Sequence, residues 1–372
     1  MHAGRKSGER LVGTNRLVGL DVLRGFAAVA VMVHHHGKYY DVLYPGRAPL
    51  SVNLFAGHFG VELFFIISGF VILMTIERKA TVWSFAIARA ARLMPCFLAA
   101  LALATVILIV APMPPLDTPT ISRFLANVTM APLLFGERVV DLPYWTLTYE
   151  MVFYASMALL LALGRLRQVE WVALAWIAAG LAFTLLADVE HHRRMSILLL
   201  AYYSNFFVIG MCLYLVQAGR ARLVTWVTLV AAILTSARGG GEQAFYASGG
   251  LYLSLTAAFA LLVWLGTTSV GRWVAAPPLV FLGRISYPLY LVHVVLGFQV
   301  IRFGVQHGWS TADGVIAAGV VSLVAATLLH YLVEVPGQRW SHRARKPPAI
   351  LPTEVVARTG GPQPVDGLNL VD

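Results

Sequence analysis

The chain has 372 residues, of which 58% are hydrophobic and only 12% are charged, and its mean hydropathy is +0.73. Soluble domains carry about 25% charged residues, so this composition excludes an ordinary water-soluble enzyme and indicates a multi-span membrane protein. The net charge of +10 then reflects basic cytoplasmic loops rather than binding to nucleic acid. The two cysteines, Cys96 and Cys212, lie far apart and supply neither a disulfide framework nor a zinc site.

Ten apolar runs approach the length of about 20 helical residues that a hydrocarbon core of about 30 Å requires. They cover residues 17–36, 56–76, 93–111, 144–163, 171–187, 195–216, 223–237, 245–266, 279–303 and 313–333. Charged residues crowd the partly apolar stretch 121–140, which favours a position in the membrane interface. We therefore expect an all-α, polytopic membrane helix bundle with about ten transmembrane helices.

The basic residues predict the orientation of the bundle. With the N-terminus in the cytoplasm, 19 basic residues fall on the cytoplasmic side and 8 on the other, and Arg24 lies within a span. Basic loops face the cytoplasm, so both termini are predicted to be cytoplasmic. The expected organisation is a cytoplasmic segment at 1–16, a transmembrane domain at 17–335, and a cytoplasmic, disordered tail at 336–372.

The first span, LVGLDVLRGFAAVAVMVHHH, contains charged and polar residues that mark a functional site, because a charge inside a membrane is costly. Arg24 and His35 are eleven residues apart, which places them within about 20° of one helix face. His34 and His36 point to either side and are expected near the interface. We expect His35 to face a cavity that Arg24 also lines and to act as a general base. Three adjacent histidines on one helix cannot converge on one ion, so no metal site is predicted.

Two glutamates in later spans are predicted to lie in the outer half of the membrane, at the depth of His35. Glu62 begins the second span, and Glu150 follows Trp145 by about a turn and a half. Each glutamate could equally be the structural partner of a buried Arg or His. Arg89 and Arg92 are neighbours at the cytoplasmic mouth of the third span and could bind an anion, although positive-inside topology alone also produces such pairs.

The ninth span carries one polar stripe. Ser286, Tyr290 and His293 recur at i, i+4 and i+7 in GRISYPLYLVH, and Pro288 is predicted to kink this helix. The stretch from His36 to Asp41 fits an H-x4-D pattern found in glycerolipid acyltransferases. Two fixed positions arise easily by chance, and this pattern lies in an outer loop, away from cytoplasmic acyl donors.

Six segments together resemble acyltransferase family 3, a family of integral membrane acyltransferases. They are LDVLRGFAAVAVMVHHH, GVELFFIISGF, RAARLMP, WTLTYEMVFY, GRISYPLYLVH and YLVEVP, in the order of the family between residues 20 and 336. Ten residues separate an Arg from a His in the family's first span, which matches Arg24 and His35. The family's paired arginines match Arg89 and Arg92.

The sequence departs from the family at two positions. Glu62 stands where related sequences commonly have Asp, so the carboxylate is kept. Met151 follows Glu150 where relatives often have a second acidic residue, so only one carboxylate remains there.

The resemblance implies an enzyme of the inner (cytoplasmic) membrane that moves an acyl group, most often acetyl from acetyl-CoA, to a hydroxyl of an envelope or exported carbohydrate. Arg89 and Arg92 would hold CoA phosphates, and Arg24 would neutralise charge deeper in the cavity. His35 would take the acceptor's proton or briefly carry the acyl group, with Glu150 as a further catalytic residue. The residues expected to contact substrates are Arg89, Arg92, Glu62, Trp145, Ser286, Tyr290 and His293.

The expected partners are the acyl-CoA donor, which is a co-substrate, the carbohydrate acceptor and the lipid bilayer, with no permanently bound cofactor or metal. The alternative function is a transporter or flippase of a lipid-linked sugar without acyl transfer. Such proteins often contain two related halves, and the sequence shows no internal repeat.

Overall fold

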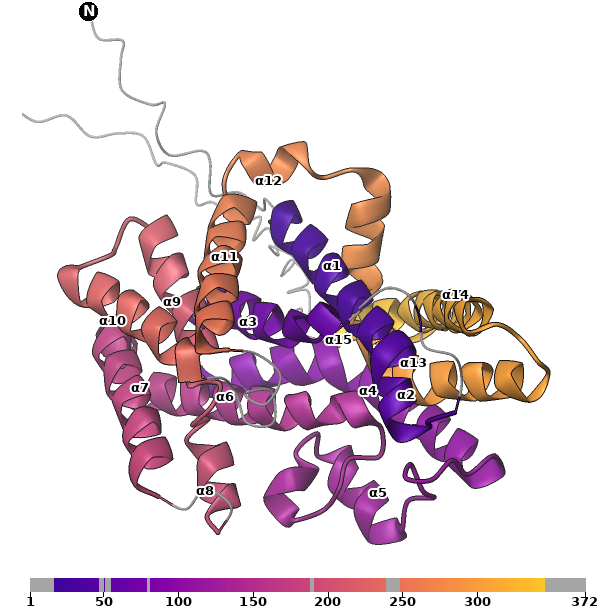
Figure 1. The fold of residues 1–372 in the computed structure, drawn as a ribbon. Helices are drawn as coiled ribbons and strands as arrows, with labels where there is room; N and C mark the ends of the chain where they lie inside the picture. The colour runs from indigo at the N-terminus through magenta and orange to yellow at the C-terminus, as the bar shows by residue number, and fades with distance from the viewer. Residues whose placement is uncertain are drawn as a thin grey trace, which may run out of the picture.

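The computed structural model describes residues 17–46, 50, 55–78, 81–187, 191–238 and 248–344. This part of the chain forms helices and no strand (Figure 1). The α-helices are α1 (Val18–His34), α2 (Tyr40–Leu43), α3 (Gly60–Ile76), α4 (Val82–Val110), α5 (Ile121–Val128), α6 (Trp145–Ala162), α7 (Val169–Leu186), α8 (Arg193–Leu198), α9 (Ser204–Gln217), α10 (Leu223–Thr235), α11 (Gly249–Thr267), α12 (Val270–Trp273), α13 (Pro277–Gln306), α14 (Thr311–Leu329) and α15 (Val335–Ala344).

Seven shorter helical segments connect or extend these helices within the described residues. The 3-10 helices are η2 (Phe55–Phe59), η3 (Pro132–Phe135), η4 (Leu142–Tyr144), η5 (Leu166–Gln168) and η6 (Ser236–Arg238), and the π-helices are η1 (His35–Tyr39) and η8 (His330–Glu334). Because η1 joins α1 to α2 without a break, the first span continues beyond its three histidines. A π-helix holds more residues per turn than an α-helix and occurs often at functional sites.

Eight helical stretches of the described chain are long and apolar enough to cross a membrane. They are Val18–Leu43, Ala56–Ile76, Val82–Val110, Leu142–Ala162, Leu166–Leu186, Gly249–Thr267, Pro277–Gln306 and Thr311–Arg339. Two shorter apolar helices, Ser204–Gln217 and Leu223–Arg238, correspond to the remaining predicted runs. The multi-pass membrane bundle is therefore confirmed, while the number of spans and the orientation of the termini stay predictions.

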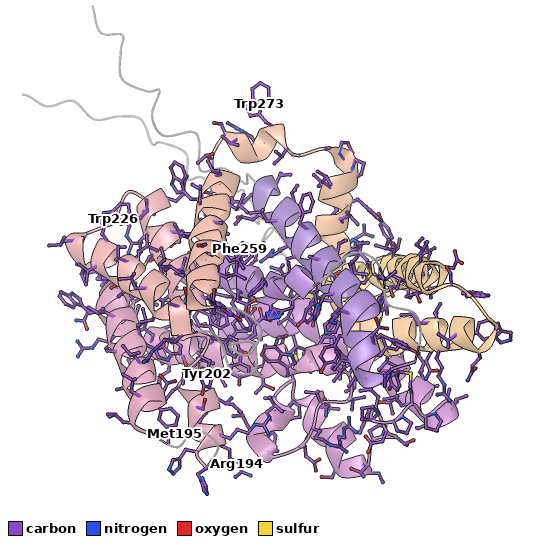
Figure 2. The ribbon with its side chains drawn as sticks, viewed as in Figure 1. Arg194, Met195, Tyr202, Trp226, Phe259 and Trp273 are labelled. Carbon is purple, nitrogen blue, oxygen red and sulfur yellow. The ribbon has the colours of Figure 1, made fainter. Side chains whose placement is uncertain are left out.

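Large apolar side chains project from the outside of the bundle (Figure 2). Trp226 is 49% exposed, and Leu186 at the end of α7 is 87% exposed. Helix α5 likewise presents Ile121 outward and buries Arg123. In water such a surface would be unfavourable, whereas lipid is its natural solvent. The eight residues of α5 are too few to cross a membrane, and its predicted interfacial position is compatible with this pattern.

Two helix pairs pack with their backbones in contact, and three of these four helices, α1, α3 and α13, line the site described below. A Cβ atom on Gly25 of α1 would lie 2.8 Å from the backbone nitrogen of Gly283 in α13. A Cβ atom on Gly210 of α9 would overlap the carbonyl oxygen of Ile66 in α3. Small residues permit this close approach between membrane helices. The contact at Gly25 therefore sets how near the later residues of α1 lie to those of α13.

Two details differ from the sequence-based expectation. The apolar run 195–216 is not one helix, because α8 ends at Leu198 and Leu200 adopts a left-handed backbone with φ of 50° before α9 begins. Hydrophobicity alone gave no signal for this break. In addition, the tail was expected to be disordered, but its residues 336–344 belong to helix α15. This helix packs against α4, since a Cβ atom on Gly337 would lie 2.9 Å from Cγ of Pro95. Residues 345–372 and 1–16 lie outside the described residues.

Candidate active site

Helices α1, α3, α4, α6 and α13 together line a cavity of about 100 Å³ in the bundle. Its charged side chains are Arg24, Arg89, Arg92 and Glu150. Its hydroxyl-bearing side chains are Ser68, Thr146, Tyr154, Ser286, Tyr287 and Tyr290, and apolar residues of α3, α4 and α6 complete the wall. Pockets that enclose a whole ligand measure about 300–1,000 Å³, so this cavity has room for one small group of a ligand rather than for a nucleotide.

Three guanidinium groups face a single carboxylate in this cavity, which leaves it electropositive. Arg24 contacts Asp21 at 4.0 Å on its own helix, whereas Arg89 and Arg92 form no ion pair with a carboxylate of the described residues. The buried Nε atom of Arg89 has no hydrogen-bond partner in this part of the chain. Uncompensated guanidinium groups in a low-dielectric site favour an anionic ligand.

Arg89 and Arg92 lie within helix α4, one turn apart, rather than before it. We expected them at the mouth of a span that begins at residue 93, but the structure begins α4 at Val82. The side chain of Thr81 accepts a hydrogen bond from the backbone N–H of Ser84 at 3.1 Å and so caps the helix. The N-cap thus gives the two arginines a fixed helical position from which both reach the cavity.

Glu150 is held by neighbours that the sequence analysis did not single out. The hydroxyl of Ser68 donates to Glu150 Oε1 at 3.1 Å, and the hydroxyl of Tyr154 donates to the same oxygen. The i, i+4 spacing of Glu150 and Tyr154 on a helix was the available signal for the second contact. No sequence pattern indicated Ser68, which comes from another helix.

His35 forms a direct contact with His293, at 3.0 Å between His35 Nδ1 and His293 Nε2. Nδ1 of His293 lies 3.1 Å and 3.0 Å from the carbonyl oxygens of Leu289 and Tyr290, so this nitrogen carries the proton and Nε2 of neutral His293 is an acceptor. His35 Nδ1 therefore donates to His293, and it also lies 2.9 Å from the Val31 carbonyl. The lone pair of neutral His35 is consequently on Nε2.

Tyr290 stands between the cavity and the histidine pair. It lines the cavity, its hydroxyl contacts Thr146 Oγ1 at 2.8 Å and donates to the Pro143 carbonyl at 3.2 Å, and its ring centroid lies 5.9 Å from that of His293. His35 itself is not among the residues that line the cavity. Arg24 and His35 therefore share a helix face but meet different parts of one site, because eleven residues of α-helix separate them by about 16 Å along the axis.

His34 and His36 are buried among neighbouring helices, and their position near the membrane interface stays a prediction. Nε2–H of His36 donates to the backbone carbonyl of His293 at 2.7 Å, and a Cβ atom on Gly297 would overlap the His36 ring. The ring of His34 lies 5.8 Å from that of His58 at the start of the second span. The neighbouring helices cover both faces of the first span at this depth, which helical geometry of a single span could not reveal.

Two further side chains hold α13 in the turn that carries His293. The hydroxyl of Tyr144 donates to the Leu291 carbonyl at 3.1 Å, and the backbone N–H of Val295 donates to Asp141 Oδ2 at 3.3 Å. Asp141 immediately precedes the membrane-length helical stretch Leu142–Ala162 and is fully buried. Burial raises the pKa of Asp141 to about 7. Sequence reasoning placed Asp141 only among the charges of the interfacial stretch.

Glu62 and Trp145 are not among the residues that line the cavity. Glu62 is buried and accepts a hydrogen bond of 3.5 Å from the hydroxyl of Tyr252, and Trp145 packs against Tyr149 and Tyr203 with ring centroids 5.6 Å and 5.5 Å apart. The other predicted residues are brought together: six line the cavity, and two form the adjacent histidine pair. The six are Arg24, Arg89, Arg92, Glu150, Ser286 and Tyr290.

The charged side chains of this arrangement are suited to an anionic ligand. No three His, Cys, Asp or Glu side chains of the described residues converge as metal ligands would. The three arginines can hold phosphate or carbonyl oxygens, and the lone pair on His35 Nε2 can accept a proton.

Comparison with known proteins defines the class. The family model described as an acyltransferase domain matches residues 17–331, and the chain therefore belongs to acyltransferase family 3, as its six segments predicted. Acyltransferase MdmB from Streptomyces mycarofaciens is 27% identical over 376 residues, which cover 91% of this chain and 95% of that relative. Nodulation protein 10 from Rhizobium leguminosarum bv. viciae is 28% identical over 165 residues, 39% of this chain and 44% of that relative. No solved structure matches the chain.

Proposed function

We propose that this protein is an O-acetyltransferase of the inner membrane that moves an acetyl group from acetyl-CoA to a hydroxyl of an envelope or exported carbohydrate. Membership in acyltransferase family 3 supports acyl transfer by a multi-pass membrane protein. The observation that carries the proposal is the electropositive cavity, with three arginines around one carboxylate, next to the His35–His293 pair. The carbohydrate acceptor rests on the resemblance to the family.

The arginines supply the donor site. CoA carries phosphate groups, and planar guanidinium groups bind phosphate through two parallel hydrogen bonds. Arg89 and Arg92 lie one turn apart on α4 and have no carboxylate partner in the described chain, so their charges are available to such a ligand. Arg24 contacts Asp21 only at 4.0 Å and can neutralise further negative charge of the donor in the same cavity. The volume of about 100 Å³ accommodates a phosphate group of the donor while the adenosine remains outside.

The histidine pair supplies the proton transfer. His35 Nε2 takes the proton of the acceptor hydroxyl as the hydroxyl oxygen attacks the thioester carbonyl carbon. The carbon–sulfur bond then breaks, and the CoA thiolate receives the proton from His35. His293 Nε2 accepts the hydrogen bond from His35 Nδ1–H throughout, which keeps the lone pair on the reacting nitrogen and stabilises the transient imidazolium.

Glu150 balances the charge of the cavity. It accepts hydrogen bonds from Ser68 and Tyr154, and it is the one carboxylate among the lining residues. Glu150→Gln keeps an oxygen for both hydroxyls but removes the negative charge. We therefore expect kcat to fall about 10- to 100-fold, while the KM for acetyl-CoA stays unchanged or decreases because the cavity becomes more positive.

The test uses purified protein in lipid nanodiscs with acetyl-CoA labelled in the acetyl group, and with envelope carbohydrate from a strain that lacks the gene. Transfer of label to the carbohydrate supports the proposal; a transporter or flippase would leave the acetyl-CoA intact. Glu170→Gln is the control, because Glu170 is a buried carboxylate that pairs with Arg222 at 3.0 Å outside the cavity. If Glu150→Gln and Glu170→Gln behave alike, the cavity is not the reaction site.

A further inference from the structure

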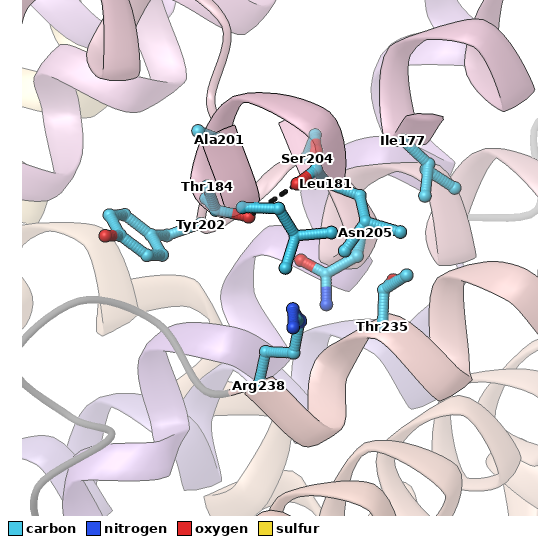
Figure 3. Close-up of a pocket in the computed structure, with 10 residues that line it drawn as sticks. Ile177, Leu181, Thr184, Ala201, Tyr202, Ser204, Asn205, Thr235 and Arg238 are labelled. Carbon is cyan, nitrogen blue, oxygen red and sulfur yellow. Dashed lines mark hydrogen bonds between the residues drawn. The ribbon is translucent and has the colours of Figure 1, made fainter. Parts of the chain in front are cut away.

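A second cavity, of about 420 Å³, lies between the end of α7, the start of α9 and the end of α10 with η6 (Figure 3). It shares no lining residue with the candidate active site. Its polar lining includes Ser204, Asn205, Thr235 and Arg238, and Leu181 lies on its apolar side. Its volume falls in the range of about 300–1,000 Å³ that is typical of ligand pockets.

Two hydrogen-bonding groups in this cavity have no partner within the described residues. Asn205 is only 7% exposed, yet its side-chain amide forms no hydrogen bond in this part of the chain. Arg238 forms no ion pair there. The two side chains point toward one another across the cavity (Figure 3). The Asn205 amide opens to the cavity and the Arg238 side chain is exposed, so a ligand that supplies acceptors for both groups would be bound favourably.

This cavity lies near one end of the helix bundle, beside apolar side chains that face outward. Successive membrane helices alternate in direction, so the ends of α7 and α10 and the start of α9 lie at the same end of the bundle as His35. At that end Leu185 and Leu186 of α7 are 56% and 87% exposed, and Leu185 also lines the cavity. The cavity therefore combines a cationic, polar side with an apolar side that is continuous with the lipid-facing surface.

We propose that this cavity binds the head group of an anionic lipid in which a phosphate is joined to a hydroxyl-rich group such as glycerol or a sugar. The guanidinium of Arg238 matches the phosphate through two parallel hydrogen bonds. The amide of Asn205 and the hydroxyl of Ser204 can both donate to and accept from the ligand's hydroxyls. The hydroxyl of Thr235 donates to the Ala232 carbonyl at 3.0 Å and can accept from the ligand. The side chain of Leu181 and the neighbouring apolar surface receive the first carbons of the lipid chains. This site does not depend on the proposed acetyl transfer.

The experiment is native mass spectrometry of the full-length protein released from detergent, titrated with phosphatidylglycerol. The wild-type protein should retain one phosphatidylglycerol more tightly than any further lipid, and more tightly than it retains phosphatidylcholine, which lacks both net negative charge and free hydroxyls. Arg238→Gln should weaken retention of that first lipid about tenfold or more, since a hydrogen-bonded charge contributes about 1.5–3 kcal/mol. Asn205→Leu should weaken it as well.

Arg193→Gln is the matched control, because Arg193 is an exposed arginine of α8 at the same end of the bundle but outside the cavity. Equal retention by the Arg238→Gln and Arg193→Gln proteins would overturn the proposal, as would equal retention of the two lipids. Soluble glycerol 1-phosphate distinguishes the source of the phosphate. If it binds as tightly as phosphatidylglycerol, the ligand is a free phosphate ester and the lipid assignment fails; weak binding supports the lipid.

Discussion

Replacement of His293 tests how the histidine pair works, because His293 touches His35 and does not line the cavity. His293→Ala removes the acceptor for His35 Nδ1–H, so the imidazolium that forms on His35 loses one charged hydrogen bond. Such a bond contributes about 1.5–3 kcal/mol, which corresponds to a fall in kcat of about 10- to 150-fold. His35→Ala removes the base itself and should cost about 10²–10⁴-fold.

Two further variants make this prediction sharper. The amide oxygen of Gln can occupy the position of His293 Nε2, so His293→Gln should recover most of the activity lost in His293→Ala. His34→Ala is the control for the loss of a buried ring beside His35, since the ring centroids of His34 and His35 lie 5.5 Å apart. Its kcat should stay within about fivefold of the wild-type value, well above the kcat of His35→Ala. All variants must accumulate in the membrane at similar levels and remain monodisperse in detergent.

The assay is steady-state acetyl transfer at saturating acetyl-CoA, extended to the double variant His35→Ala/His293→Ala. Since His293 acts only through His35, the double variant should be no slower than His35→Ala alone. The KM for acetyl-CoA should change little in each case, because neither histidine lines the cavity. If His293→Ala slows the reaction by the same factor with and without His35, the two residues act independently and the proton-transfer scheme is wrong.

Three other predictions concern the donor site, the buried aspartate and the topology. Arg89→Ala or Arg92→Ala should raise the KM for acetyl-CoA about 10- to 150-fold while the protein accumulates normally in the membrane. Lysine at either position should lower this KM only in part, because an ammonium lacks the guanidinium fork. An unchanged KM in the double alanine variant would exclude both arginines from donor binding. Burial raises the pKa of Asp141 to about 7, so the folded protein holds the proton of the Asp141 carboxyl group more tightly than the unfolded chain does. The contribution of this protonated carboxyl group to stability is lost as the pH rises through about 7. Between pH 5 and pH 8 the free energy of unfolding of the wild type should therefore fall by up to about 3 kcal/mol relative to that of Asp141→Asn. The measurement is the difference between the thermal unfolding midpoints of the two proteins at each pH. A difference that does not change with pH would contradict this prediction. Reporter fusions after residues 43 and 110 should be periplasmic and one after residue 220 cytoplasmic, and a periplasmic C-terminus would show that the spans are miscounted.

The sequence was sufficient to predict those features of the fold and of the candidate site whose signal lies within one helix. The helical class, the apolar runs and the stripe of Ser286 and Tyr290 all follow from composition and periodicity, and the structure places both of these side chains at one cavity. Arg24 and Glu150 were found because a charge within an apolar span is rare. The assignment of catalytic or binding roles to these residues stays a prediction.

The sequence was insufficient where a contact joins two helices. The stripe on the ninth span indicated His293 but not its contact with His35, which depends on the close packing of α1 on α13 at Gly25. Glu62 was expected to contact substrate, yet the structure places it against Tyr252 of α11, because membrane depth does not specify which neighbour a side chain faces. The bond from Val295 N–H to Asp141 likewise joins distant parts of the chain.

The π-helix η1 gives the first span two parts that respond differently to a change in length. One residue inserted between Arg24 and His35 would turn His35 by about 100° and move it about 1.5 Å along the axis, away from His293. The wide turn from His35 to Tyr39 already contains an additional residue relative to an α-helix. Deletion of Gly37 would let this turn close to α-helical geometry and would shift only the residues that follow. The register of His35 is thus set by the residues before it, and variation in the length of this span can be absorbed after it.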